Sequence, residues 1–407
     1  MVKNVIIVCD SASVTGGAER IAISSAIGLS DAGYNVYYFS AKGPIDTALL
    51  QSGVQVICLN QYDILSDPNR SRAIFQGLWN FKAEKEFRKL LRSLPREDTI
   101  IHFHSWTKAL SASLFKVSEE LDYHIVLTLH DYFSLCPNGG LFNYKKKHIC
   151  YLKPMSLPCL VCDCDSRSYP QKIWRYLRQL IQNHYLFENK KLNFISISEL
   201  NRSLLVSHLH HRIKKIYEVN NPVNFGIRYD VDIKANHLYL YIGRLSCEKG
   251  IDLFCEAMAQ LHLQGCVLGD GYLLQPLQKK YPNIRFAGWV DGAKKDEYIK
   301  KCKALVFPSL WYEGAPLTIL EMKSHGVPCI VPDLCAASEE IKDGVTGYIF
   351  KSGSLSSLEN AIEKYEKTDL EEMQKNVIAS FKPEKYLLSN YIKKLLSVYD
   401  SVLNEDS

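Results

Sequence analysis

Two glutamates eight positions apart, Glu313 and Glu321, stand in the segment "SLWYEGAPLTILEMKSHG" around a Gly-Ala-Pro-Leu turn. The preceding "ALVFPSL" has the pattern of a buried strand, and "PLTILEMKSHG" has that of a helix ended by Gly326. We therefore expect Glu313 in the turn, beside free backbone N–H groups, and Glu321 one turn into the helix. Carboxylates in these positions could bind the hydroxyls of a sugar, and Glu321 could accept both hydroxyls of a ribose. The alternative is a charge that stabilises the helix start and an exposed helix residue.

Two further segments carry groups that bind anions. In "IGRLSCEKG", Arg244 offers a planar fork and Lys249 a compact charge, a pair that could hold a diphosphate or could face only water. In "VTGGAER", Gly16 and Gly17 let backbone N–H groups approach an anion at a helix start. This segment lacks the Gly-x-Gly-x-x-Gly spacing of a dinucleotide site, and a tight structural turn is its alternative interpretation.

The elements that must position these residues alternate along the chain as short β-branched runs and longer helical patterns. The first series ends at Asn220, Asn221 and Pro222, and the second runs from "HLYLYIGRL" to "TGYIF". We expect an α/β protein with Rossmann-like domains at 1–222 and 223–382 and a C-terminal helix in 383–407 that could pack back on the first domain. Ligands of open α/β sheets bind beyond the carboxyl ends of strands, which favours the cleft between the domains.

Composition excludes several classes of protein. The 407 residues carry 49 basic and 44 acidic side chains, too even a balance for a protein that coats nucleic acid. The first residues lack a signal-peptide pattern, and no apolar run approaches the ~20 residues of a membrane helix. We therefore expect a cytoplasmic protein with reduced thiols.

A cysteine-rich insertion interrupts the first series at about 134–169 and is too long for an ordinary connection. The spacing Cys159-x-x-Cys162 suits one side of a tetrahedral structural zinc site, which Cys136 and Cys150 could complete, with Cys164 or His148 as substitutes. The alternative is a set of reduced, partly buried thiols.

The Glu-x7-Glu pair, the Arg-x4-Lys loop, "LGDGY" and the early Gly-Gly turn occur in an order that resembles the retaining GT4 family of glycosyltransferases. The resemblance covers nearly the whole chain and implies the GT-B fold, two facing Rossmann-like domains with a catalytic cleft between them. It implies catalytic roles for Glu313, beside the donor sugar, and for His130, with His104 and Asp131 on the acceptor side. The donor-binding residues that it implies are Gly16, Gly17, Arg244, Lys249, Gly314, Ala315, Pro316, Leu317 and Glu321.

The implied activity is that of a retaining hexosyltransferase, which moves a sugar from a UDP- or GDP-sugar to an acceptor hydroxyl with the basic pair in place of a metal. Aromatic and basic residues on first-domain helices suggest contact with an anionic membrane, and hence a lipid-linked oligosaccharide acceptor at its inner face, as in bacterial surface-polysaccharide assembly. The rivals are a GT-B nucleotide-sugar epimerase or phosphorylase, and a zinc-dependent interaction protein on an inactive scaffold.

Overall fold

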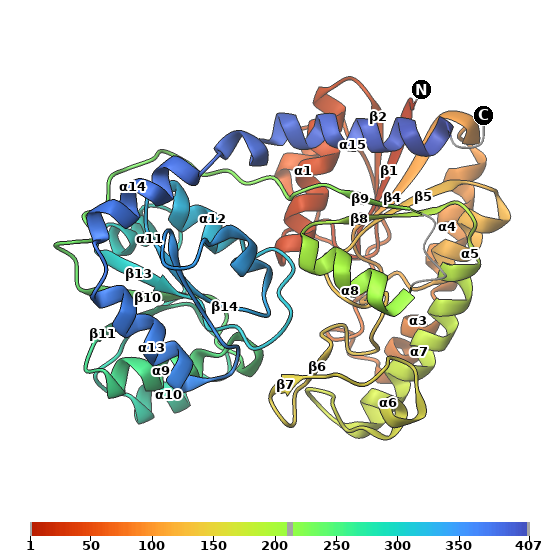
Figure 1. Ribbon diagram of the computed structural model, residues 1–407. Coiled ribbons are helices and arrows are strands. Elements are labelled where there is room, and N and C mark those ends of the chain that lie inside the picture. Colours follow the sequence, from red (N-terminus) through yellow and green to blue (C-terminus); the bar gives the residue numbers. More distant parts are fainter. Residues whose placement is uncertain (1, 210–214, 405–407) are drawn as a thin grey trace.

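Two parallel β-sheets, each covered by helices on both faces, make up the computed structural model, which describes residues 2–209 and 215–404 (Figure 1). The first sheet has the order β3-β2-β1-β4-β5-β8-β9 and the second has the order β12-β11-β10-β13-β14-β15. This arrangement confirms the predicted fold class of two Rossmann-like domains. No helix in the described ranges is long and apolar enough to cross a bilayer.

The first domain places its sheet at the centre, between two hydrophobic clusters. Its strands are β1 (Asn4–Val8), β2 (Asn35–Ser40), β3 (Gln55–Cys58), β4 (Thr99–Phe103), β5 (His124–Thr128), β8 (Leu192–Ser196) and β9 (Ile216–Glu218). Its helices are α1 (Gly17–Asp31), α2 (Thr47–Leu50), α3 (Arg70–Leu78), α4 (Phe81–Arg92), α5 (Ser113–Glu120), α6 (Leu157–Val161), α7 (Tyr169–Glu188) and α8 (Glu199–Leu209). Every residue of β1, β4, β5 and β8 is buried, as strands covered on both faces require.

The second domain repeats this plan with its own core on each face of the sheet. Its strands are β10 (Leu238–Ile242), β11 (Gln264–Leu268), β12 (Arg285–Gly288), β13 (Cys302–Val306), β14 (Cys329–Pro332) and β15 (Gly347–Phe350). Its helices are α9 (Ile251–Gln260), α10 (Leu274–Lys280), α11 (Gly292–Ile299), α12 (Leu317–Ser324), α13 (Leu355–Glu366) and α14 (Leu370–Ser380).

In each sheet the order in which the chain adds strands reverses at one internal pair of strands, which is called the switch point. The chain leaves β1 towards β2 and β3 and then returns to β4 on the other side; in the second sheet β10 and β13 stand in the same relation. Ligands bind at the carboxyl ends of such a pair, because the loops diverge there and leave a crevice. The candidate residues of both domains follow these four strands or their neighbours.

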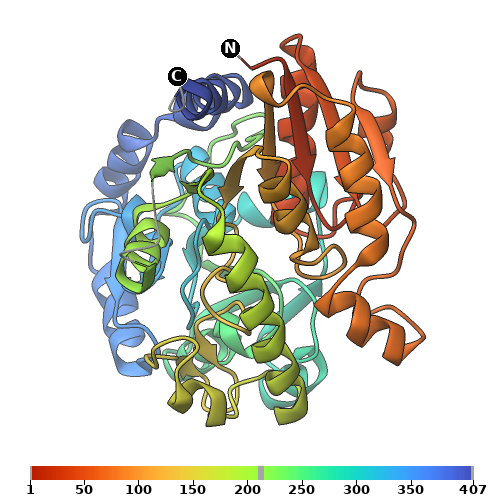
Figure 2. The same cartoon turned by 90° about the vertical axis from the view of Figure 1, so that its right-hand side faces the viewer.

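The last helix, α15 (Leu388–Leu403), lies across the first domain, as Figures 1 and 2 show. It packs on α1, where Gly28 permits the close approach of Ile392, and Tyr391 hydrogen bonds Ser25 at 2.8 Å. The helix begins later than residue 383, because Pro383–Tyr386 forms a separate 3-10 turn and Leu387 is extended. Both ends of the described chain therefore lie on the first domain.

Candidate active site

The loop after β10 brings two cations to the switch point of the second sheet. Arg244 contacts the Glu248 carboxylate at 2.9 Å and keeps 63% of its side chain exposed, whereas Lys249 is mostly buried. Gly250 makes this position possible: its φ is +66°, and a Cβ there would lie 1.9 Å from the carbonyl oxygen of Pro308. The loops after β10 and β13 are thus in contact, and any larger residue would separate them.

Glu313 is the centre of a hydrogen-bonded group in the loop after β13. Its Oε1 accepts from Lys249 Nζ at 2.5 Å, and its Oε2 accepts from Ser309 Oγ and Trp311 Nε1, each at 3.1 Å. Burial acts to raise the pKa of Glu313, but Lys249 and the two neutral donors outweigh it and hold the pKa below its ordinary value. The carboxylate is ionised and fixed in orientation.

The start of α12 leaves backbone donors beside this carboxylate. The N–H groups of Gly314, Ala315 and Leu317 donate no hydrogen bond within the described ranges. Ala315 and Leu317, together with Pro316, Lys249 and Glu313, line a cavity of about 210 Å³, and Gly314 lines a neighbouring one. Free N–H groups at a helix start suit an anion or sugar hydroxyls.

Glu321 lies on the second turn of α12, as its position in the sequence predicts. Its carboxylate forms an ion pair with Lys295 of α11, a partner that the sequence did not suggest. Near this pair, the ring of Tyr229 stacks on His325 with centroids 3.9 Å apart. Glu321 is therefore neither an isolated exposed charge nor free for a ribose until Lys295 moves.

Three histidines, His102, His104 and His130, lie together at the carboxyl ends of β4 and β5; we call this part of the molecule the first-domain wall. His104 Nδ1 lies 2.9 Å from His130 Nε2, whereas His102 is held by Tyr399 of α15 and by Thr128. Burial lowers the pKa of His130 to about 4 and that of His102 to about 3. These rings are neutral at pH 7, and His104 Nε2 has no hydrogen-bond partner in the described ranges.

Two acidic groups near the histidines, Asp10 and Glu19, were missed by the sequence reasoning. Asp10, directly after β1, accepts from the N–H groups of residues 108–110 at 2.8–2.9 Å, and Lys108 lies 3.8 Å from the buried Glu19. Burial raises the pKa of Asp131 to about 6. The position of Asp10 at the switch point was the one signal that could have identified it.

Gly16 and Gly17 stand at the exposed start of α1, with Gly16 as the N-cap. A Cβ on Gly16 would lie 3.0 Å from the Glu19 carboxylate, so the turn is tight, while Gly17 faces open space. The structure places the turn beside the acidic group and at a helix N-terminus.

Segments from both domains meet beside the cavity. The Glu339 carboxylate, on the 3-10 turn Ala336–Glu340, accepts from the N–H groups of Glu199 and Leu200 at the start of α8, at 3.1 and 2.7 Å. A Cβ on Gly314 would lie 3.4 Å from Ile197. The candidate residues of the two domains therefore face one cleft.

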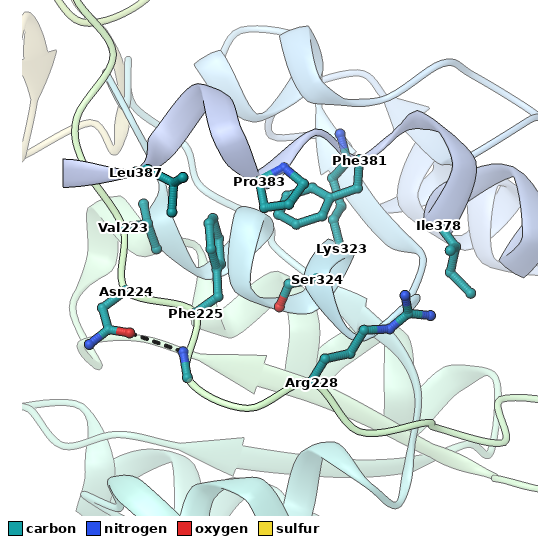
Figure 3. Close-up of a pocket in the computed structure, with 11 residues that line it drawn as sticks. Val223, Asn224, Phe225, Arg228, Lys323, Ser324, Ile378, Phe381, Pro383 and Leu387 are labelled. Carbon is teal, nitrogen blue, oxygen red and sulfur yellow. Dashed lines mark hydrogen bonds between the residues drawn. The ribbon is translucent and has the colours of Figure 1, made fainter. Parts of the chain in front are cut away.

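A larger cavity, of about 390 Å³, lies where the chain passes between the domains (Figure 3). Phe225 of the linker packs there against Phe381, with ring centroids 5.1 Å apart, and Lys323 and Arg228 line the rim. None of the predicted site residues lines this cavity. It belongs to the interdomain connections and not to the candidate active site.

The cysteine-rich insertion is organised around a lysine. Lys172 of α7 is 1% exposed, donates to the carbonyl oxygen of Cys159 at 2.8 Å, and lies 3.3 Å from Cys164 Sγ. Burial raises the pKa of Cys164 to about 12, against the opposing charge of Lys172. In the described ranges no three His, Cys, Asp or Glu side chains are arranged to hold a metal ion. Zinc at Cys136, Cys150, Cys159 and Cys162 does not fit the side chains as they lie, and it stays a prediction.

Comparison with known proteins agrees with this geometry. Residues 230–382 match the model of the family "Glycosyl transferases group 1". The alpha-D-kanosaminyltransferase of Streptomyces kanamyceticus is 27% identical over 187 residues, 43% of this chain and 48% of that protein. The UDP-Gal:alpha-D-GlcNAc-diphosphoundecaprenol alpha-1,3-galactosyltransferase of Escherichia coli is 29% identical over 141 residues, 32% of this chain and 36% of that protein. These alignments span about half or less of the two relatives.

The solved structure of Anabaena HepE in complex with UDP superimposes over 98% of this chain and 100% of its own, with a TM-score of 0.67 and 16% identity. At this identity the likeness establishes the fold. Residues 230–382 are therefore similar to the glycosyl transferases of group 1, and the chain as a whole has the GT-B fold.

Proposed function

We propose that the chain is a retaining glycosyltransferase, which moves a sugar from a nucleotide-sugar donor to an acceptor hydroxyl without a catalytic metal. The observation that carries the proposal is the cavity in which Lys249, ionised Glu313 and the free N–H groups at the start of α12 converge. These fixed groups could bind a phosphate and a sugar hydroxyl and could stabilise the charge that develops on the leaving diphosphate.

In this proposal Arg244 and Lys249 neutralise the donor diphosphate, and Glu321 binds the ribose after releasing Lys295. Glu313 and the backbone of Gly314 hold the transferred sugar. The bond from the anomeric carbon to the phosphate oxygen breaks while a bond to the acceptor oxygen forms on the same face. The proton of the acceptor hydroxyl passes to the departing phosphate oxygen, which balances the reaction.

The first-domain wall would receive the acceptor. His104 and His130 are neutral and can accept or donate hydrogen bonds, and Asp131 adds an acidic group beside them. We propose a lipid-linked oligosaccharide as acceptor, because the name of the Escherichia coli relative includes a diphosphoundecaprenol-linked sugar. A cytoplasmic location at the inner membrane face stays a prediction.

Contact with an anionic membrane is supported by exposed aromatic side chains on α3 and α4 of the first domain. Phe75 and Phe81 are 71% and 75% exposed, and Phe81 lines a shallow groove on α4 with basic residues that include Lys85 and Lys89. Apolar rings amid basic side chains suit the interface of an anionic bilayer. The double variant Phe75→Ser, Phe81→Ser should bind vesicles of phosphatidylglycerol and phosphatidylcholine more weakly, whereas exposed Ile227→Ser on the linker should not.

The test of the activity is incubation with a panel of UDP- and GDP-sugars in excess EDTA, followed by detection of slow donor hydrolysis and of thermal stabilisation. We expect one donor to be hydrolysed with release of the nucleoside diphosphate. A protein that binds and hydrolyses none of them would contradict the proposal. Interconversion of the donor sugar without release would favour the epimerase alternative.

A further inference from the structure

A hairpin of the cysteine-rich insertion brings first-domain residues to the donor side of the cleft. Its strands are β6 (Phe142–Asn143) and β7 (His148–Ile149), and Figure 1 shows the hairpin below the gap between the two domains. The Asn143 side chain fixes the turn, because its Oδ1 accepts from the N–H groups of Lys145 and Lys146 at 3.1 and 3.0 Å.

Tyr144 begins this turn, and its hydroxyl lies close to Trp311 of the second domain. A Cβ placed on Gly140 would be 3.3 Å from the Tyr144 hydroxyl and 3.4 Å from Cε3 of Trp311. Trp311 in turn donates to Glu313 at 3.1 Å and lies beneath Lys249, whose Nζ is 5.2 Å from its ring centroid. Tyr144 therefore stands next to the group that forms the candidate donor site.

The Tyr144 hydroxyl has no hydrogen-bond partner in the described ranges, although its ring is held firmly. The ring packs edge-to-face on the buried Phe142 with centroids 5.2 Å apart, and the Tyr144 N–H donates to the Cys164 carbonyl at 3.2 Å. A half-buried hydroxyl that is oriented but unpaired is suited to a ligand. Burial raises the pKa of Tyr144, and the charges of Glu248 and Arg244 act on it from across the cleft.

We propose that Tyr144 is a donor-positioning residue that the first domain supplies, and that its hydroxyl donates a hydrogen bond to a phosphate oxygen of the bound nucleoside diphosphate. The inference rests on the proposed function and adds to it a contact from the insertion. The exposed Lys145–Lys147 turn adds positive charge on the same side. Donor binding then links the insertion to the second domain.

The test compares binding of UDP and of uridine by calorimetry and competition, with GDP and guanosine in their place if UDP does not bind. Tyr144→Phe should weaken the diphosphate about 10-fold, the scale of one hydrogen bond to a charged group, and should leave the nucleoside within about twofold. The matched control is Tyr169→Phe, which removes a hydroxyl that bonds the Leu160 carbonyl at 3.3 Å near the same insertion. It should change neither affinity.

Trypsin supplies a second readout, because the exposed lysines of the turn are its cleavage sites. Saturating UDP should slow cleavage at Lys145–Lys147 in the unmodified chain, and less so in Tyr144→Phe at equal saturation. Equal affinity of Tyr144→Phe and the unmodified chain for the diphosphate would overturn the inference and leave the proposed function intact. Failure of the unmodified chain to bind UDP or GDP would overturn the proposed function and the inference with it.

Discussion

The two walls of the cleft differ in how their polar groups are held. In the second domain Lys249 and Glu313 come from loops at one switch point and form an ion pair, and Glu321, on the helix that follows, pairs with Lys295. In the first domain His104 and His130 are neutral, His104 is buried and His130 partly buried, and the two residues lie 26 positions apart, each shortly after its own strand. One wall is a fixed arrangement of ion pairs suited to a diphosphate, and the other presents neutral imidazoles, with acidic groups beside them, that suit hydroxyls.

Replacement of Glu313 is the strongest test of this difference. Glu313→Gln keeps the shape of the side chain but removes its charge, so we expect turnover to fall about 1,000-fold while affinity for the nucleoside diphosphate changes little. Steady-state kinetics and calorimetry measure the two effects. The control is Glu297→Gln on the exposed face of α11. Near-normal turnover in Glu313→Gln would remove the residue from the reacting sugar.

The basic pair should show a smaller and graded effect. Lys249→Ala should lower turnover about 100-fold, because the cation is mostly buried and its loss leaves Glu313 unpaired. Arg244→Ala should cost less, since this side chain is largely exposed. Excess EDTA should not reduce the activity of the unmodified chain. An activity that requires added magnesium or manganese would contradict the assignment of charge neutralisation to these residues.

Glu321 should affect nucleotide binding more than turnover. Glu321→Ala should weaken UDP or GDP by ~1 to 3 kcal/mol, the scale of unpaired polar groups. Lys295→Ala is the comparison variant, because Lys295 forms an ion pair with the Glu321 carboxylate. Removal of Lys295 should leave the affinity for the nucleoside diphosphate unchanged or higher. Calorimetry on the pair separates a ribose contact from an ion pair that only stabilises α11 and α12. Unchanged affinity in Glu321→Ala would exclude the ribose contact.

The neutral side chain of His130 predicts a pH dependence of stability. The pKa of His130 is about 4 in the folded chain and about 6.5 when unfolded, so below pH 6.5 the unfolded state binds more protons. Stability contributed by the neutral ring is complete above pH 6.5 and is lost as the pH falls towards 4, by about 2 kcal/mol at pH 5. Chemical denaturation at pH 7 and pH 5 should show a smaller loss for His130→Gln than for the unmodified chain. Exposed His237→Gln should behave like the unmodified chain.

The second-domain residues of the candidate donor site could be predicted from sequence, because their positions follow from the local pattern of a strand, a turn and a helix. Glu313 precedes a helix that begins after Pro316, and Glu321 lies on that helix at a known spacing, so a short segment determines where both are placed. The ion pair of Glu321 with Lys295 could not be predicted, because it depends on how α11 packs beside α12.

The first-domain wall and the insertion were less accessible to such reasoning. Asp10 and Lys108 come together from segments 98 residues apart in the sequence. The cysteine spacing left a zinc site and a set of reduced thiols as alternatives, and neither predicted the Lys172 ammonium that the structure places beside the thiols. No local pattern shows which long side chain a fold will bury.

The position of α15 has a consequence for synthesis of the chain. The apolar side of α1 and the buried His102 are completed by Tyr391, Leu395 and Tyr399, which the ribosome adds after the whole second domain. At roughly 5 to 20 residues per second, the ~170 residues between β9 and α15 take about 10 to 30 s to make. During that time the apolar side of α1 that α15 covers is exposed, and we expect a chain truncated before Leu388 to be prone to aggregation.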